Sequence, residues 1–471
     1  MNEKRLGSKI LAKVIAELRE ALGDRATTAD TVRNDHAKDV CHHAPCAPDA
    51  VVFPLTSAEV SGVVEICARH VCPIVPYGTG TGVEGGVVAV RGGVSLDLSR
   101  MNRILRVSIA DMDATVEAGV TRNQLNEHLG ATDTGLLFAV DPGADASLGG
   151  MAATCASGSS AVRYGTMRDN VLGLTVVLPD GRIVHTGSRA RKSSSGYDLT
   201  RLLVGSEGTL GVITDVTLRL VRQPEAVASA VCSFPDIDAA VETVIDVMSH
   251  GIPMARIELL DEIQVGAVNR YSGLDYKELP TLFFEFHGTE SSVAENTARV
   301  GVIVRKRGGS EFAWATETGE RDRLWQARYD AYYASLALRP GALGYVTDVC
   351  VPISALADCI RETRKELEKT ALPAPLFGHV GDGNFHVVFA IDPEDPSELE
   401  EVRKLDQHIV SLALARGGTA SGEHGIGLGK QDALLREHGA AADVMRAIKK
   451  SFDPQGIMNP GKIFTPEDNS A

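Results

Sequence analysis

Hydrophobic residues near the start of the chain recur at the spacing of one helical face. Between residues 4 and 22 the apolar positions follow each other at three- and four-residue steps, and Gly23 comes next as a predicted C-terminal cap. The stretch lacks the contiguous apolar run of a signal peptide, and Glu17 and Glu20 argue against a transit peptide. We therefore expect a helix that belongs to the folded protein.

Residues 51–220 contain short β-like runs separated by long polar and Gly-rich stretches. Thr56 and Glu59 have the spacing of a capping box ahead of an apolar helical pattern. Strands are predicted at 51–53, 74–76, 94–98, 115–120, 174–178 and 212–220. Helices are few and short in this part, which is typical of an α+β fold and not of a doubly wound sheet.

The pattern changes at Pro224, which predicts the start of a second domain. Beyond it, helices are predicted at 238–250, 321–338 and 356–367, and strands at 256–260 and 282–286. Helices interleaved with strands in this way suggest an α+β domain of the ferredoxin-like kind. A last helical pattern spans 431–450, and turn signals follow it.

Composition and charge narrow the class of protein. The 471 residues carry a formal charge of −15 without a long Lys/Arg run, which argues against nucleic acid as the partner. Apolar residues, 44% of the total, are spread along the chain and predict a folded core. No run of eighteen apolar residues predicts a membrane-spanning helix.

The cysteines bear on location and on metal binding. Eight cysteines without a secretion signal suggest reduced thiols and a cytoplasmic protein, with peripheral membrane association as an alternative. The segment from Cys41 to Cys46 also contains two histidines, but it has no second ligand pair elsewhere in the chain. We interpret it as a surface loop.

The glycine-rich loops point to a phosphate-bearing cofactor. Gly80, Gly82 and Gly85 match the G-x-G-x-x-G pattern, but residues 87–90 and 94–96 look like strand where a Rossmann fold needs a helix. No P-loop motif occurs. Consecutive small residues can still turn their N–H groups toward an anion, and 142–160 and 205–211 are similar segments. Three such loops favour a long, diphosphate-containing cofactor such as a flavin.

A histidine pair flanks a predicted hairpin turn. Asp382 and Gly383 are typical of a two-residue turn between β-like runs, and this register would place His379 directly opposite His386. Opposed residues share one face with Cβ atoms about 5 Å apart, which suits two imidazoles that bind one metal ion. A pair of histidines with a purely structural or surface role remains the alternative.

A third metal ligand is predicted in the Gly-rich stretch 417–427. Glu423 and His424 are adjacent there, so in an extended segment one side chain can face a metal and the other a substrate. Two histidines and one carboxylate with open coordination positions suit Zn, Mn or Fe.

Together these segments resemble the vanillyl-alcohol oxidase, or p-cresol methylhydroxylase (PCMH), type of FAD enzyme. The nearest match is the branch of cytochrome-linked D-lactate dehydrogenases. The matching stretches are 76–86, 141–150, 163–170, 204–214, 378–386, 422–427 and 458–462. The resemblance therefore extends from about residue 46 to the C-terminus.

The resemblance implies an α+β architecture in four parts. A helix and lead-in at 1–45 would precede a two-subdomain, PCMH-type FAD-binding domain at 46–223. A ferredoxin-like α+β cap at 224–430 would carry the substrate site, and 431–471 would return to the flavin. The implied FAD-binding residues are Pro76, Gly78, Thr79, Gly80, Thr81, Gly82, Pro142, Gly143, Ser147, Gly150, Ala153, Gly208, Ile213 and Asn459. Residues 77–127 contain no histidine, which predicts a non-covalent flavin.

The same resemblance assigns roles around the metal. His379, His386 and Glu423 match the metal ligands of the family, and His424 matches its active-site histidine. Arg328 would meet a substrate carboxylate, and Asn384 would also touch the substrate. Relatives that act on 2-hydroxyglutarate have lysine where this chain has Val346, which weakens a dicarboxylate substrate.

The expected activity is oxidation of a small D-2-hydroxy acid, D-lactate first, to the 2-oxo acid. In this hypothesis the metal lowers the pKa of the hydroxyl, His424 takes its proton, and hydride passes to flavin N5. Electrons would go to a cytochrome, a quinone or an electron-transfer flavoprotein, and a homodimer stays open. Alternatives are a glycolate oxidase subunit, a D-2-hydroxyglutarate dehydrogenase-like enzyme, a non-redox transferase of the ether-lipid synthase type, and a flavin or metal storage module.

Overall fold

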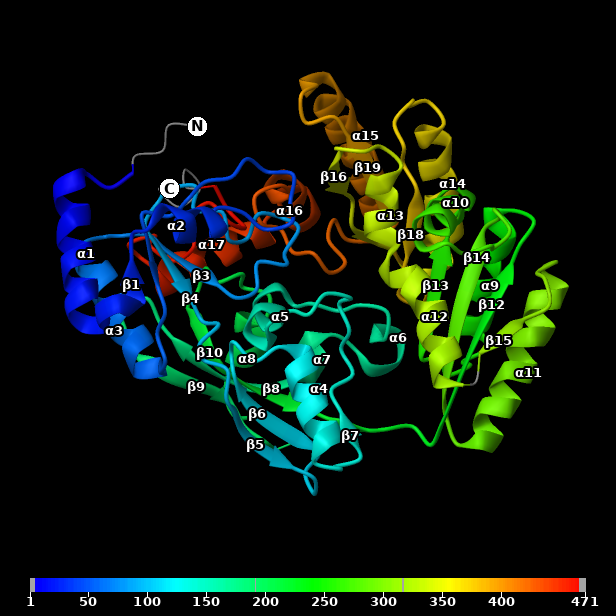
Figure 1. The fold of residues 1–471 in the computed structure, drawn as a ribbon, viewed down its shortest axis with the longest axis horizontal. Coiled ribbons are helices and arrows are strands. Elements are labelled where there is room, and N and C mark those ends of the chain that lie inside the picture. The colour runs from blue at the N-terminus through cyan, green and yellow to red at the C-terminus, as the bar shows by residue number, and fades with distance from the viewer. Residues whose placement is uncertain (1–4, 191, 316, 466–471) are drawn as a thin grey trace. The chain divides into compact units, whose positions relative to one another are not determined.

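The protein divides into two compact units in a computed structural model that describes residues 5–190, 192–315 and 317–465 (Figure 1). Unit 1 comprises Met1–Ser157, Gly165–Gln223 and Glu423–Ala471, and unit 2 comprises Gly158–Tyr164 and Pro224–Gly422. The chain thus passes from unit 1 into the main part of unit 2 after Gln223 and re-enters unit 1 after Gly422. All eight cysteines are free thiols.

Two main sheets form the body of unit 1. The first has the order β1-β2-β4-β3, in which the last three strands are parallel and β1 is antiparallel to β2. Its strands are β1 (Ala26–Thr27), β2 (Ala50–Val52), β3 (Ile74–Tyr77) and β4 (Val94–Asp97). The second is antiparallel, in the order β5-β6-β10-β8-β9. It contains β5 (Ile104–Ser108), β6 (Asp113–Glu117), β8 (Val171–Val177), β9 (Ile183–Gly187) and β10 (Val212–Arg219).

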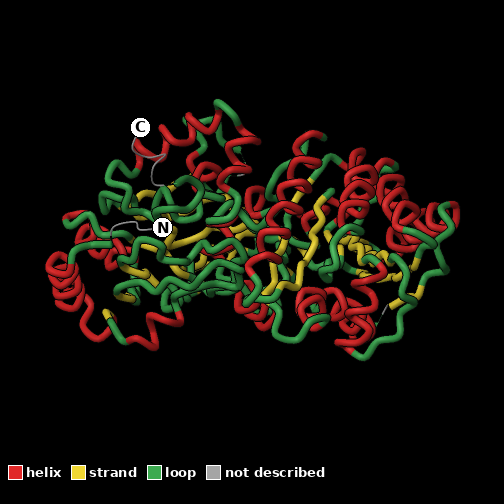
Figure 2. Tube along the Cα trace, turned by 90° about the horizontal axis from the view of Figure 1, so that it is seen from above, coloured by secondary structure: helices red, strands yellow, loops and turns green. Residues whose placement is uncertain are grey.

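Short helices and long loops complete unit 1, and the loops are green in Figure 2. A small antiparallel pair joins β7 (Leu136–Leu137) to β11 (Val221–Arg222). The helices are α1 (Ser8–Leu22), α2 (Asp30–Asp35), α3 (Ser57–Arg69), α4 (Arg122–Ala131), α5 (Leu148–Thr154), α7 (Met167–Asn170), α8 (Leu199–Leu203), α16 (Gln431–His438) and α17 (Ala441–Phe452), with a 3-10 turn η1 (Gly23–Arg25). Because Val14, Leu18 and Leu22 lie on one face of α1, that face is buried in the core that α3 shares.

Three details of unit 1 differ from the sequence expectation or qualify it. Residues 87–90 do not form a strand. The Ala89 N–H donates to Cys46 O and Val88 O accepts from Lys462 Nζ, so these two backbone groups do not pair with a neighbouring strand. The predicted helix 431–450 is interrupted at Gly439, whose φ is +51°. Of the predicted capping box, the bond from the Glu59 N–H to the Thr56 hydroxyl is present, but the Glu59 carboxylate pairs with Arg25.

Unit 2 contains an eight-stranded sheet. Its order is β15-β12-β14-β13-β18-β19-β16, and β17 also pairs with β19. All of these pairs are antiparallel. The strands are β12 (Ala226–Ser233), β13 (Arg256–Leu260), β14 (Thr281–Gly288), β15 (Ala313–Ala315), β16 (Leu343–Val346), β17 (Val349–Cys350), β18 (Leu376–Gly378) and β19 (Asn384–Ile391).

The first half of that sheet has ferredoxin-like connectivity. The chain runs β12, α9, β13, α10, β14, α11, β15, so α10 is an addition to the ferredoxin-like pattern, and the strands lie in the order fourth, first, third, second. Helices α9 and α11 pack on one another, and α11 contacts β12 and β14 (Figure 1). The helices of unit 2 are α6 (Ala161–Tyr164), α9 (Ile237–Ser249), α10 (Glu262–Ser272), α11 (Glu290–Lys306), α12 (Thr318–Tyr329), α13 (Ala331–Ala337), α14 (Leu356–Leu367) and α15 (Pro396–Ala415), with 3-10 turns η2 (Ile353–Ala355) and η3 (Val380–Asp382).

The predicted helix 321–338 of unit 2 is divided at Asp330 into α12 and α13. Trp325 and Ala327 of α12 and Ala331 of α13 are buried in one hydrophobic cluster. Among the described helices, none combines the length and the apolar composition that crossing a bilayer requires. The α+β class expected from the sequence is confirmed.

Candidate functional site

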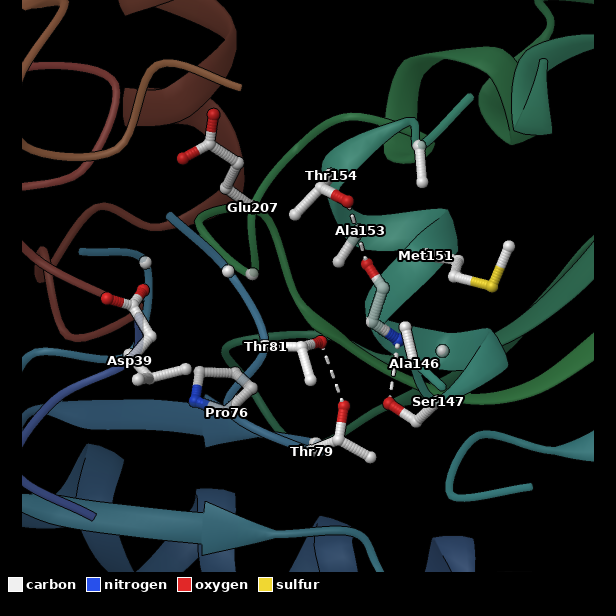
Figure 3. Close-up of a pocket in the computed structure, with 18 of the residues that line it drawn as sticks. Asp39, Pro76, Thr79, Thr81, Ala146, Ser147, Met151, Ala153, Thr154 and Glu207 are labelled. Carbon is white, nitrogen blue, oxygen red and sulfur yellow. Dashed lines mark hydrogen bonds between the residues drawn. The ribbon is translucent and has the colours of Figure 1, made fainter. Parts of the chain in front are cut away.

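The glycine loops of unit 1 line one large pocket (Figure 3). It encloses about 1330 Å³ of empty space when the space open to solvent is counted. The lining includes these residues expected to bind FAD: Pro76, Gly78, Thr79, Gly80, Thr81, Gly82, Pro142, Ser147, Gly150, Ala153, Gly208, Ile213 and Asn459. Gly143 is not part of it, although its neighbours Pro142 and Ala144 are.

Several glycines of this pocket have no room for a side chain. A Cβ on Gly78 would lie 2.3 Å from Ser147 Oγ, and one on Gly149 would lie 2.5 Å from the Cβ of Ala118. Gly208 adopts a φ of +71°, in the left-handed region that favours glycine. The first loop therefore lies close to Ser147 at the N-terminus of α5, and Figure 3 shows Thr79, Thr81 and Ser147 among the residues that line the pocket. Such a surface of small residues fits a long cofactor with a diphosphate.

Asn459 ties the separate loops of the pocket together. Its Nδ2 donates to Gly86 O at 3.0 Å and to Glu207 O at 2.7 Å, while its Oδ1 accepts from Lys462 Nζ at 3.2 Å. The side chain is thus occupied by protein groups, and its φ is +40°. Asn459 holds the first and third glycine loops at a set distance, and this clamping is a role that the sequence did not indicate.

Glu207 connects the third glycine loop to the segment after His424. Its two carboxylate oxygens accept the backbone N–H groups of Ile426 at 2.7 Å and Gly427 at 2.8 Å. Burial raises the pKa of this carboxyl, and the two N–H donors act in the opposite direction. The buried pair of Lys430 with Glu84, at 2.8 Å, holds the same segment against the first loop.

Glu423 and His424 lie in the wall of this pocket. One carboxylate oxygen of Glu423 accepts from Ser157 Oγ at 2.9 Å, and the other lies 3.8 Å from His424 Nε2. Unit 1 therefore brings the predicted active-site histidine together with the predicted FAD loops, although more than 200 residues separate Gly208 from His424 in the chain.

The histidine hairpin of unit 2 forms with a different register from the predicted one. Phe377, not His379, lies opposite His386, because η3 and Gly383, with a φ of +82°, make a five-residue connection. A shift of two residues keeps the same side chains on the same face. The rings of His379 and His386 consequently still meet, with centroids 5.6 Å apart and planes at 84°.

Hydrogen bonds determine that Nδ1 of each histidine ring carries a proton. His379 Nδ1 donates to Glu258 Oε1 at 2.8 Å, and His386 Nδ1 donates to Thr347 O at 3.0 Å. Glu258 is fully buried; burial alone would raise its pKa, but His379 and Arg328 hold it below the ordinary value. Since the carboxylate and the carbonyl are acceptors only, each Nδ1 carries a proton, and in the neutral form of each ring the lone pair lies on Nε2. This is the arrangement typical of metal-binding histidines.

Arg328 and Asn384 also lie in unit 2. Arg328 Nε donates to Glu258 Oε2 at 2.6 Å, so a substrate carboxylate would meet its two terminal nitrogens. Asn384 Nδ2 donates to Asp348 Oδ1 at 2.8 Å and to Val349 O at 2.9 Å. Its Oδ1 is buried and has no hydrogen-bond partner in the part of the chain that the structure describes. Asn384 could therefore contact a substrate only as an acceptor.

Two family descriptions match this chain. The FAD binding domain matches residues 48–187, and the C-terminal domain of FAD linked oxidases matches residues 223–463. A solved structure of p-cresol methylhydroxylase with bound substrate superposes with a TM-score of 0.81 at 19% identity, covering 98% of each chain. That likeness shows the fold, and it confirms the PCMH-type architecture expected from the sequence.

Two curated relatives are much closer in sequence. A probable mitochondrial D-lactate dehydrogenase of Danio rerio is 50% identical over 98% of this chain and 94% of its own length. A mitochondrial cytochrome-type D-lactate dehydrogenase of Arabidopsis thaliana is 47% identical over 96% of this chain and 80% of its own length.

The mitochondrial names of both relatives contradict the expected cytoplasmic location, and that prediction is wrong. Charge and free thiols describe the folded body, and a compartment is chosen by a targeting signal that leaves no trace in those properties. The family matches, the relatives and the loop-lined pocket agree with one another. The chain belongs to the family of FAD-linked oxidases.

Proposed function

We propose that this enzyme oxidises a small D-2-hydroxy acid, D-lactate first, to the 2-oxo acid with the help of FAD and a divalent metal. The names of the two relatives from Danio rerio and Arabidopsis thaliana support D-lactate as the substrate. The observation that carries the proposal is the position of His424 in the wall of the pocket that the FAD loops line.

His424 is the general base of the proposed reaction. Its imidazole would accept the proton of the substrate hydroxyl as the C2–H bond breaks, because imidazole can take and release protons near neutral pH. Bound FAD supplies the acceptor for the C2 hydride, at N5 of its ring. One proton and one hydride leave the substrate, which becomes the 2-oxo acid. Ser157, by holding Glu423, keeps the neighbouring residue of this segment in place.

His379 and His386 would bind the metal through their Nε2 atoms, and Glu423 would be the third ligand. The position of Glu423 is restricted by the tight packing of the residue before it. Gly422 packs so closely on Asn384 that a Cβ there would be 2.3 Å from Asn384 Nδ2, and Glu423 is the next residue. Two imidazoles and a carboxylate suit Zn, Mn or Fe, which would lower the pKa of a bound hydroxyl.

The groups proposed to bind the substrate favour a small monocarboxylate. Arg328 would pair with the carboxylate through its terminal nitrogens, and Asn384 Oδ1 would accept a hydrogen bond. Val346, at the position where relatives acting on 2-hydroxyglutarate have lysine, packs against a hydrophobic cluster and offers no charge to a second carboxylate. Lactate or glycolate therefore fits better than a dicarboxylate.

The cytochrome in the name of the Arabidopsis relative favours a cytochrome as electron acceptor. Quinone and electron-transfer flavoprotein are the alternatives to be compared in a steady-state assay. The relatives' names also favour a mitochondrial location.

Anaerobic mixing of the holoenzyme with D- and L-2-hydroxy acids tests the function directly. We expect D-lactate to bleach the flavin absorbance within the time of turnover and to yield pyruvate, and L-lactate to leave it unchanged. A flavin that no 2-hydroxy acid reduces would contradict the proposal and favour a non-redox use of the cofactor.

Replacement of Glu258 by glutamine tests whether the hydrogen bond between Glu258 and His379 supports metal binding. The amide can present an N–H to His379 Nδ1 and so move the ring proton to Nε2, which blocks that ligand atom. We expect metal affinity to fall about 10- to 100-fold, measured by competition with a chelator, while FAD content is unchanged.

The matched control for this variant is Glu320→Gln, an exposed glutamate on the same helix as Arg328. It should bind metal as the wild type does. Equal metal affinity of Glu258→Gln and the wild type would contradict the role of Glu258 in holding His379.

A further inference from the structure

Asp39 contributes an acidic side chain to the FAD pocket from the N-terminal lead-in. It lies outside the stretch 48–187 that matches the FAD binding domain, yet it lines the same pocket as Thr81 and Pro76. In Figure 3, its carboxyl group lies on the side of the pocket away from Ser147 and Thr154 of α5. The residue is only 6% exposed.

The backbone around Asp39 is held against the first glycine loop. The Val40 N–H donates to Gly82 O at 2.9 Å, and the Cys41 N–H donates to Asp39 Oδ1 at 3.2 Å. A Cβ on Gly82 would lie 3.2 Å from Asp39 Oδ2, so this oxygen is close to the loop. Asp39 is therefore held at the wall of the pocket by the hydrogen bonds of the two residues that follow it in the chain.

Asp39 Oδ2 is buried and has no hydrogen-bond partner within the described ranges. Burial raises the pKa of Asp39, and the Cys41 side chain and nearby backbone N–H groups, those of Cys41 and Gly86 among them, counteract this only in part. A buried carboxylate oxygen of this kind is unfavourable unless a donor reaches it.

We propose that Asp39 Oδ2 accepts a hydrogen bond from an O–H or N–H group of FAD. A carboxylate repels the diphosphate, so the partner must be a hydroxyl or ring N–H group of the flavin half or a donor of the adenosine half. Asp39 is then a binding residue for FAD supplied by the lead-in, and the pocket is completed by chain outside the FAD binding domain. This inference depends on FAD binding alone and not on the substrate or the metal.

The test compares FAD binding with the stability of the apoprotein. Asp39→Asn and Asp39→Ala are prepared without flavin, and the Kd for FAD is measured by quenching of flavin fluorescence. We expect FAD to bind about tenfold or more weakly, since hydrogen bonds to charged groups are the strong ones. The Tm of the apoprotein should stay equal or rise, because a buried and incompletely paired carboxylate has been removed. Asp35→Asn, on the exposed end of α2, is the control and should match the wild type in both.

Two results would overturn the proposal. One is a Kd for FAD within about twofold of the wild type in both variants, because the hydrogen bond would then be absent. The other is a Tm of the apoprotein that falls as far as that of the holoenzyme, or an apoprotein that does not fold, since Asp39 would then have a purely structural role. Titration with FMN assigns the donor: an equal loss for FMN and FAD places it in the flavin half, and a loss for FAD alone places it in the adenosine half.

Discussion

Replacing His424 by alanine is expected to reduce turnover of D-lactate by roughly 10²- to 10⁴-fold, the contribution typical of a general base. The side chain lines the proposed FAD pocket but lies outside the glycine loops proposed to hold the cofactor, so FAD content and the flavin spectrum should stay as in the wild type. Turnover is measured with an artificial electron acceptor, and added imidazole should restore part of it in the variant.

His408, exposed on α15, provides the matched control, and His408→Ala should keep full activity. Near-normal activity of His424→Ala would remove His424 from the mechanism. A loss of activity that is accompanied by a loss of FAD would instead mean that His424 supports the pocket.

Removal of the metal, by a chelator or by His386→Ala, is expected to have the second large effect. His386 is 3% exposed, and its Nδ1 is held by Thr347 O, so its Nε2 is the atom that a metal would use. We expect turnover to fall by more than about 100-fold, because loss of a ligand exceeds the 10- to 100-fold effect of an outer partner. Zn, Mn or Fe returned to the chelated wild type should restore activity, and the metal that restores most identifies the native ion.

The His386→Ala variant distinguishes a role of His386 in metal binding from a purely structural role. His386→Ala should bind no stoichiometric metal by elemental analysis, should retain FAD, and should not respond to added metal at concentrations that restore the chelated wild type. Full activity of the wild type after exhaustive chelation would contradict the metal altogether.

Local sequence pattern was sufficient to predict much of the secondary structure and the glycine-rich loops that line the pocket. Strands such as β13 and helices such as α9 and α14 lie within a residue or so of their predicted ranges, because alternation and helical periodicity depend on near neighbours. Pocket-lining glycines such as Gly78 and Gly208 were recognisable because a close approach or a left-handed φ leaves few other residues possible.

The histidine hairpin shows where local reasoning stops. The sequence predicted that His379 and His386 meet, and their rings do, but the turn has five residues in place of two. A Cβ on Gly383 would lie 2.0 Å from Val351 O, so a segment distant in the chain determines the conformation of this connection. The face was predictable because a shift of two residues preserves it, whereas the register was not.

The hydrogen-bond partners of the site residues could be identified only from the tertiary structure. Glu258 lies 121 residues from His379, Glu207 lies 219 residues from Ile426, and nothing in their local sequence indicates these bonds. Asp39 was missed for the same reason, since a single carboxylate in a polar lead-in resembles many solvated ones until burial is known. The sequence by itself determined most of the helices and strands and the positions of the glycine-rich loops, because these depend on neighbours along the chain. Only the tertiary structure decided the register of the hairpin, the protonated nitrogen of each histidine and the carboxylates of the pocket, because each depends on contacts between segments far apart in the chain.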